Sequence, residues 1–217
     1  MEVGGSIFVT GTDTNVGKTY VAAGIAAALR RRGVDVGVMK PVASGSADDA
    51  KALIKASGSD DPFDLVSPIR LRDPISPHLA AKRQGIRIDL KRIDRAFATL
   101  RSRHDFVIVE GAGGLLVPIR DGFTMAELAR RMGLPLLIVA RDALGTINHT
   151  MLTVEAARSR GLKVLGVVVN RSRPGRPDLA ERLNPKAIAD ATGVKVLASL
   201  PWRPGSRAFD AIARALA

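Results

Sequence analysis

Eleven residues near the start of the chain, from Val9 to Thr19, combine the residue types that bind a phosphate chain. Gly11 and Gly17 allow backbone N–H groups to face an anion without a Cβ in the way, and the helix expected to follow adds partial positive charge. Lys18 can reach the β- and γ-phosphates of a nucleotide, and the Thr19 hydroxyl can bind Mg²⁺. We therefore predict a phosphate-binding loop, although five residues separate its glycines where the common motif has four.

A second lysine, Lys40, ends an apolar strand candidate and precedes the segment Pro-Val-Ala-Ser-Gly-Ser. A lysine in solvent at the end of a strand is the simple structural interpretation. Because ligands of a parallel sheet bind beyond the carboxyl ends of its strands, Lys40 can also face the phosphates beside Lys18. Two ammonium groups there would stabilise the charge that builds during phosphoryl transfer, and we favour this functional interpretation.

Glu110 follows the apolar run Phe-Val-Ile-Val and precedes Gly-Ala-Gly-Gly. An acidic residue there is the expected second contributor to a Mg²⁺ site in a protein with a phosphate-binding loop. Asp48 and Asp49 begin a predicted helix, where either carboxylate would favour the helix N-terminus. One of the two is a candidate for a further Mg²⁺ ligand, and their order in the chain leaves open which one.

Residues 145–149, Gly-Thr-Ile-Asn-His, lead into another predicted helix. The first N–H groups of that helix form an anion site that suits a carboxylate. An ordinary helix cap by Thr146 or Asn148 explains the same residues equally well. The three histidines of the chain do not have the spacing of metal ligands.

Strands and helices that would position these residues alternate along the chain. We predict strands over 6–10, 35–40, 106–109, 134–140, 164–169 and 194–200, an extended piece over 66–71 and a glycine-rich turn over 111–114. Helices are predicted over 19–32, 46–57, 78–83, 89–103, 124–132, 148–160, 185–192 and 206–216. This alternation predicts a single α/β domain over 1–217, with a mainly parallel, doubly wound sheet and helices on both faces.

Composition narrows the classes of function. The absence of cysteine excludes thiol nucleophiles, disulfides and cysteine-based zinc sites. The formal net charge of +12 is compatible with a polyanionic partner, but the basic residues are scattered, mostly at helix C-terminal ends, and aromatic residues are only 4%, so we expect no nucleic-acid partner. Without a leader sequence or a long apolar run, we expect a cytoplasmic protein with no membrane partner.

Six segments, in this order, resemble the dethiobiotin synthetase family: 11–19, 40–46, 76–78, 109–115, 145–150 and 200–202. The resemblance implies the fold of a P-loop NTPase and an ATP- and Mg²⁺-dependent cyclo-ligase of biotin biosynthesis. In that reaction 7,8-diaminononanoate captures CO₂ as a carbamate, which attacks the γ-phosphate of ATP to give a carbamic–phosphoric anhydride. The second amine then closes the ring of dethiobiotin, and ADP and phosphate are released.

The resemblance also implies a role for individual residues. Lys18 and Lys40 would be catalytic, stabilising the carbamate and the transferring phosphoryl group. Thr19, Asp49 and Glu110 would hold Mg²⁺, with Asp49 preferred to Asp48. The nucleotide would contact Asn15, Val16, Gly17, Lys18, Thr19, Tyr20, Asp49, Glu110, Gly111, Ala112, Gly113, Asn170, Arg171, Pro201, Trp202 and Arg203. The diamine would contact Ser44, Gly113, Gly114, Leu115, Gly145, Thr146, Ile147 and Asn148. The family is a homodimer in which the tail of the substrate reaches the partner subunit.

The main alternative is a partitioning-type ATPase, a switch of the same P-loop branch that binds DNA or a protein partner. Such switches carry a lysine early in the loop, where this chain has Thr12 and Asp13. The excess of positive charge is the feature that favours the alternative. Because the segment from Arg203 to Arg207 lacks an acidic residue present in some synthetases, the sequence leaves open the choice of ATP, CTP or another nucleotide.

Overall fold

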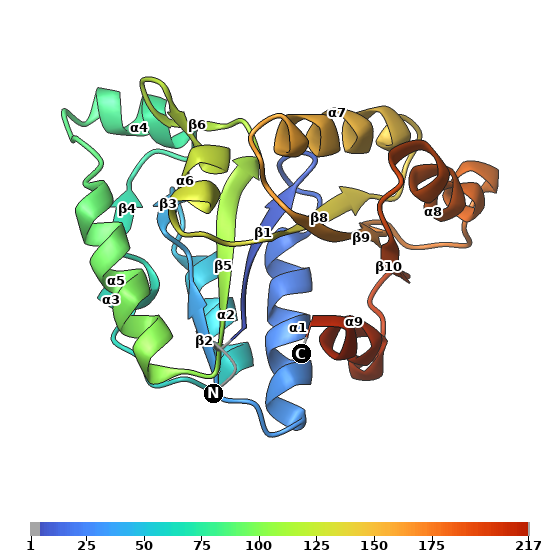
Figure 1. Ribbon diagram of the computed structural model, residues 1–217, viewed down its shortest axis with the longest axis horizontal. Coiled ribbons are helices and arrows are strands. Elements are labelled where there is room, and N and C mark those ends of the chain that lie inside the picture. The colour runs from blue at the N-terminus through green and yellow to red at the C-terminus, as the bar shows by residue number, and fades with distance from the viewer. Residues whose placement is uncertain (1–4, 217) are drawn as a thin grey trace.

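A sheet of six parallel strands runs through the described part of the chain, residues 5–216 of the computed structural model (Figure 1). Its strand order is β10–β9–β8–β1–β5–β2, and every neighbouring pair is parallel. The strands are β1 (Ser6–Gly11), β2 (Val36–Met39), β5 (Phe106–Gly114), β8 (Leu136–Arg141), β9 (Val164–Asn170) and β10 (Val196–Leu200). The prediction of an α/β fold with a doubly wound, mainly parallel sheet is confirmed.

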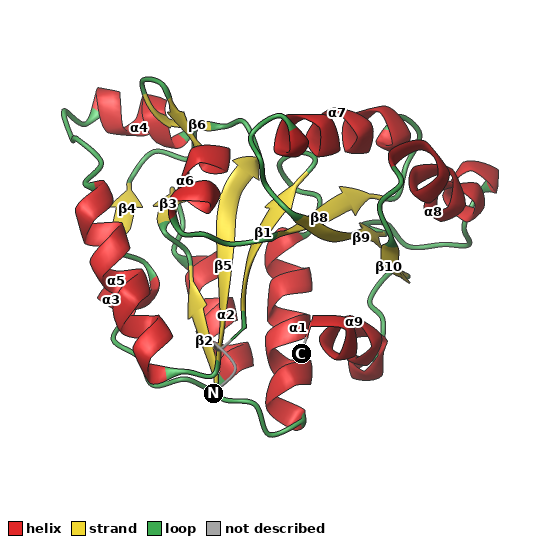
Figure 2. Ribbon diagram, viewed as in Figure 1, coloured by secondary structure: helices red, strands yellow, loops and turns green. Residues whose placement is uncertain are grey.

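Helices cover both faces of this sheet (Figure 2). They are α1 (Lys18–Arg31), α2 (Asp48–Ser57), α3 (Phe63–Val66), α4 (Pro77–Arg83), α5 (Leu90–Arg103), α6 (Met125–Arg131), α7 (Thr146–Arg158), α8 (Leu179–Thr192) and α9 (Asp210–Leu216), with a 3₁₀ turn, η1 (Ser206–Phe209), before the last. Successive side chains of a strand point to opposite faces. Ile7 and Val9 of β1 therefore pack in the core formed with α1, α2 and α9, and Phe8 packs with α5 and α6.

The order of the strands gathers their C-terminal loops at one edge. The chain passes from β1 to β2 on the far side of β5, returns to β5, and then crosses β1 to reach β8. The carboxyl end of β1 thus lies where the winding changes direction, which is where ligands of open α/β sheets bind. The phosphate-binding loop follows β1, Lys40 follows β2 and Glu110 lies in β5.

Two small sheets depart from the sequence-based prediction. β3 (Val42–Ser44) pairs in parallel with β4 (Ile69–Leu71), in a region predicted to be a loop and a single extended piece. β6 (Pro118–Arg120) and β7 (Phe123–Thr124) form an antiparallel pair that was not predicted. These strands have two or three residues each, too few for hydrophobic periodicity to show.

Several boundaries also differ from the prediction, and three of them are informative. β5 continues through the glycine-rich segment predicted to be a turn, because Gly114 pairs with Gly11 of β1. α7 begins at Thr146, two positions before its predicted start. α8 begins at Leu179 and contains Pro185, the first residue of the predicted helix. The capping box formed by Asp178 and Glu181 marks the true start of α8, and the proline is accommodated within the helix.

Within residues 5–216, none of the helices combines the length and the apolar character needed to cross a membrane. The predicted domain also includes residues 1–4 and 217, which lie outside the described residues.

Candidate functional site

The phosphate-binding loop joins β1 to α1 with two residues in left-handed conformations. Gly17, directly before α1, has φ of 95°, a conformation that glycine adopts without strain. A Cβ at this position would lie 2.2 Å from Asn170 Nδ2, so glycine is also required for the close approach of that side chain. Asn15 has φ of 58°, which asparagine tolerates better than most residues with a side chain.

Lys18 begins α1 and turns back over the loop. Its side chain is buried, and Nζ donates a hydrogen bond to the Asp13 carbonyl oxygen at 3.0 Å. Burial, followed by the nearby charge of Lys40, lowers the pKa of Lys18 to about 8. Its ammonium group is therefore poorly neutralised in the protein, and a phosphate group would stabilise its charge.

Lys40 follows β2 and is only 4% exposed. Its Nζ lies 2.6 Å from Glu110 Oε1, 2.8 Å from Asp49 Oδ2 and 3.3 Å from the Gly111 carbonyl oxygen. Burial alone would lower its pKa, but Glu110 and Asp49 outweigh burial and raise the pKa of Lys40 above its ordinary value. The structure thus excludes the simple interpretation of a strand-end lysine in solvent.

Glu110 lies in β5, fully buried, and connects Lys40 to α1. The Thr19 hydroxyl donates a hydrogen bond to its Oε1 at 2.8 Å, and Oε2 is buried without a partner among residues 5–216. The Asp49 carboxylate also lies beside Lys40 Nζ, whereas Asp48 lies at the exposed start of α2. Burial raises the pKa of Asp49, but its ion pair with Lys40 outweighs this effect and keeps the pKa below its usual value.

These side chains border a cavity of about 770 Å³ at the carboxyl edge of the sheet. Ser44, whose hydroxyl is buried without a partner in the described chain, and Gly113 also line it. Gly114 and Leu115 are not among the lining residues, and Leu115 is buried in the hydrophobic core instead. Other residues of the cavity wall were absent from the predicted site: Thr14, Ala43, Ser46, Pro74, Ile75, Ser76, Pro77 and Val117. The resemblance at 76–78 was the sequence signal that pointed to this wall.

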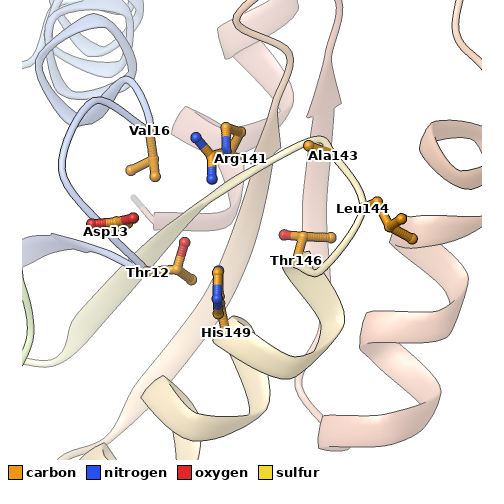
Figure 3. A pocket seen from close by; sticks show the side chains of 8 residues that line it. All are labelled: Thr12, Asp13, Val16, Arg141, Ala143, Leu144, Thr146 and His149. Carbon is orange, nitrogen blue, oxygen red and sulfur yellow. The ribbon is translucent and has the colours of Figure 1, made fainter.

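The predicted carboxylate-binding residues at the start of α7 lie apart from this cavity. Thr146 lines a second, smaller pocket with residues of the phosphate-binding loop (Figure 3), and its hydroxyl is buried without a partner among residues 5–216. Gly145 and Asn148 are exposed, and Ile147 packs against the core beneath α7 and α8. The remaining residues of the pocket are Thr12, Asp13, Val16, Arg141, Ala143, Leu144 and His149.

The other residues predicted to contact the nucleotide lie in three different environments. Tyr20 lines the large cavity and packs edge-to-face on Phe209, with ring centroids 5.6 Å apart. Trp202 and Arg203 are exposed beyond β10, following the exposed Pro201, and the guanidinium of Arg203 lies 5.2 Å from the Trp202 ring.

Asn170 and Arg171, at the end of β9, are buried. Asn170 Nδ2 donates to the Val16 carbonyl oxygen at 2.9 Å, so this residue touches the phosphate-binding loop. Arg171 forms an ion pair with Glu181 at 3.0 Å and donates to the Arg176 carbonyl oxygen at 2.5 Å. Those contacts bind Arg171 to the segment before α8 and to α8 itself.

Comparisons with known proteins agree with this arrangement. A family model described as an AAA domain matches residues 5–208. The ATP-dependent dethiobiotin synthetase BioD of Anaeromyxobacter dehalogenans (strain 2CP-C) is 46% identical over 202 residues, 91% of this chain and 90% of the relative. The protein of the same name from Thermodesulfovibrio yellowstonii is 38% identical over 210 residues, 90% of this chain and 88% of the relative.

Among solved structures, the cell division ATPase MinD of Pyrococcus furiosus superimposes with a TM-score of 0.60 and covers 98% of each chain. At 21% sequence identity this similarity shows the fold alone. The synthetases, in contrast, match at up to 46% identity over nine-tenths of the chain, and the chain belongs to the ATP-dependent dethiobiotin synthetase family.

Proposed function

We propose that this chain is a cyclo-ligase that forms dethiobiotin from 7,8-diaminononanoate, CO₂ and ATP. The observation that carries the proposal is the buried ammonium of Lys40, held between Glu110 and Asp49 beside the phosphate-binding loop. A second cation, Lys18, borders the same cavity of about 770 Å³. The names of the relatives support this reaction. Its need for ATP leads us to assign it to the cytoplasm.

The reaction creates negative charge on the carbamate and on the transferring phosphoryl group, and nearby cations would stabilise both. One amine of the diamine takes up CO₂ and loses a proton, which gives a carbamate. A carbamate oxygen bonds to the γ-phosphorus of ATP as the bond to ADP breaks. The second amine then attacks the carbonyl carbon, and phosphate leaves as the ring closes. We assign Lys18 and Lys40 to the stabilisation of the carbamate and the phosphoryl oxygens, because fixed charges in a water-poor site lower the barrier most.

The residues around Glu110 fit a Mg²⁺ ion. Mg²⁺ takes oxygen ligands and is usually held by one or two carboxylates together with phosphates and waters. The Thr19 hydroxyl and the Asp49 and Glu110 carboxylates supply such a set, and Glu110 Oε2 lacks a partner within residues 5–216. Among residues 5–216, no group of three or more His, Cys, Asp and Glu side chains is arranged so that it could hold a metal ion by itself, so substrate phosphates would complete the coordination. Bound there, Mg²⁺ would neutralise part of the phosphate charge.

The two ends of the diamine would be recognised differently. Ser44 and Gly113 border the cavity beside Lys40 and suit the amines; Gly114 and Leu115 continue the same segment of backbone. For the carboxylate tail we assign residues 145–148, the start of α7, because helix N–H groups favour an anion. The unpartnered Thr146 hydroxyl supports this assignment.

A homodimer would allow the start of α7 from a second copy to complete the site. Four leucines in or next to α7 and α8 are more than half exposed, with exposed fractions from 56% to 91%: Leu144, Leu152, Leu179 and Leu183. Exposed apolar side chains on adjacent helices are typical of a surface that another chain covers. We therefore place the second copy against this α7–α8 surface.

For the adenine base we propose a binding site formed by Tyr20, Asn170, Arg171 and residues 201–203. Asn170 Oδ1 is buried without a partner in the described residues and could accept a hydrogen bond from an amino group of the base. The exposed Trp202 offers a flat apolar surface beside Arg203. Arg171 already has its ion pair with Glu181, so we assign it to the support of this base site.

The proposed function is tested by measuring phosphate release from ATP with and without diaminononanoate and bicarbonate, with dethiobiotin followed by mass spectrometry. We expect one phosphate per dethiobiotin, and release that depends on both co-substrates. Phosphate release that ignores the diamine but rises with DNA would support the partitioning ATPase instead. That alternative is not favoured, since the superimposed MinD structure is 21% identical, which shows only the fold, whereas the synthetases are up to 46% identical.

A further inference from the structure

Asn170 connects the end of β9 to the backbone of the phosphate-binding loop. Its buried Nδ2 donates to the Val16 carbonyl oxygen at 2.9 Å, across 154 positions of sequence. Among residues 5–216, it is the one side chain from outside residues 11–19 that hydrogen bonds to the backbone of this loop. The contact therefore joins the end of β9 to the phosphate-binding loop, two segments that lie far apart in the sequence.

The loop has a conformation that needs such support. Asn15 and Gly17, on either side of Val16, both have left-handed backbones, with φ of 58° and 95°. For Asn15, which has a side chain, this conformation costs energy and persists only where surrounding contacts hold it. Gly17 also permits the contact, since a Cβ there would overlap Asn170 Nδ2.

The contact fixes the direction of one peptide group. In a planar trans peptide the carbonyl oxygen and the following N–H point in opposite directions. The Val16 carbonyl points to Asn170, so the Gly17 N–H points away from it, and Gly17 lines the large cavity. We propose that Asn170 is a positioning residue that orients the Val16–Gly17 peptide so that the Gly17 N–H faces the nucleotide phosphates. This inference rests on the proposed binding of ATP.

Asn170 is itself held firmly in the sheet. Its carbonyl oxygen accepts from Asp142 N at 2.9 Å, and the next residue, Arg171, donates its N–H to the Leu200 carbonyl at 3.0 Å. β9 is thus fixed between β8 and β10 at this point. The amide has two ends with separate tasks: Nδ2 orients the loop, while Oδ1 is the end available to a base. A ligand that has phosphates but no base therefore tests the contact of Nδ2 separately from that of Oδ1.

The test measures the affinity of inorganic tripolyphosphate and of ATP, both with Mg²⁺, by calorimetry. We expect Asn170→Ala and Asn170→Ser to weaken tripolyphosphate binding about three- to tenfold, the net value of one hydrogen bond. ATP binding falls by at least the same factor. Asn184→Ala is the matched control, because Asn184 is also a buried amide but bonds Asp142, at 3.0 Å, instead of the loop. It should lower the unfolding midpoint without changing the affinity for tripolyphosphate.

Other results of these binding measurements would lead to different conclusions about Asn170. Tripolyphosphate affinity that stays at the wild-type value in both Asn170 variants would overturn the proposal, and a fall for ATP alone would assign Asn170 to the base. An equal loss of affinity in Asn184→Ala would also overturn it, since the effect would then follow from lost stability. Wild-type protein that binds neither probe would refute the proposed nucleotide site itself, a result distinct from the failure of Asn170.

Discussion

Lys40 Nζ and Glu110 Oε1 lie 2.6 Å apart, with both side chains almost completely removed from solvent. The register of the sheet explains why these two side chains lie so close together. Met39 of β2 is paired with Val109 of β5, so the residues that follow them emerge side by side at the same edge. A buried ion pair costs desolvation energy that its attraction barely offsets. Because the pair lies beside the phosphate-binding loop, we propose that it is present for chemistry.

Replacing Lys40 by methionine should affect both catalysis and folding. Without the ammonium, Glu110 is a buried carboxylate with its main partner removed, so we expect the free energy of unfolding to fall by about 3–5 kcal/mol. Turnover should fall about a hundredfold or more, as when a charge that stabilises a transition state is deleted. Urea denaturation and steady-state phosphate release measure the two effects.

The double variant Lys40→Met, Glu110→Met separates these effects, because it removes both charges. It should recover most of the lost stability and none of the activity. Lys82→Met, which removes an exposed lysine, is the control and should alter neither the free energy of unfolding nor the turnover. A single Lys40 variant as stable as the wild type would show that the pair contributes nothing to folding.

Asp49→Asn should raise the Mg²⁺ concentration needed for half-maximal activity about tenfold, because a neutral amide is a weaker ligand for Mg²⁺ than a carboxylate. Asp48→Asn is its matched control: the same change, one residue away, on the exposed start of α2. We expect it to leave the Mg²⁺ requirement unchanged. The measurement is a Mg²⁺ titration of phosphate release at saturating ATP. The reverse result would move the ligand to Asp48, and no effect from either would remove Asp49 from the metal site.

The sequence was sufficient to predict the fold because its apolar runs alternate so regularly with helical patterns. It also predicted that Lys18, Lys40 and Glu110 would gather, because parallel strands present their carboxyl ends at one edge. It did not predict that Lys40 would be buried. Burial depends on the pairing of β2 with β5, which is a property of the strand order and not of either strand alone.

Other features of the structure had only a weak signal in the sequence, or none. The bond between Asn170 and Val16 joins residues 154 positions apart, and no local pattern announces it. The start of α8 did have a signal, since Asp178 and Glu181 are spaced as a capping box. Pro185 masked it, because proline is favoured in the first turn of a helix and so resembles a start.

Charged substitutions on the α7–α8 surface test the proposed homodimer. Leu152→Asp and Leu179→Asp place a carboxylate where we expect the second copy to exclude water, so each should shift the protein from dimer to monomer. Analytical ultracentrifugation measures the shift. Activity should fall with it, because the monomer lacks the partner's carboxylate-binding helix. Leu79→Asp, on α4, is the control, since Leu79 is 51% exposed outside this surface. A monomeric wild type with full activity would contradict both the dimer and the shared site.

His104 should make stability depend on pH through a cluster far from the cavity. Its Nδ1 lies 3.0 Å from Asp35 Oδ1 and its Nε2 2.6 Å from Asp61 Oδ2, and Arg103 also pairs with Asp61 at 3.0 Å. Burial alone would lower the pKa of His104, but hydrogen bonds and ion pairs with the two carboxylates outweigh burial and raise it.

A histidine whose pKa is raised by folding stabilises the protein fully below its unfolded pKa of about 6.5. The contribution is lost as pH rises through the higher folded value. Relative to His104→Gln, which keeps a polar side chain without the charge, the wild type should therefore have its largest advantage in unfolding free energy near pH 5.5. The advantage should shrink steadily toward pH 9, as measured by urea denaturation. An advantage that is constant across this range would mean that His104 carries no extra proton in the folded protein, and that the cluster stabilises the chain only through neutral hydrogen bonds.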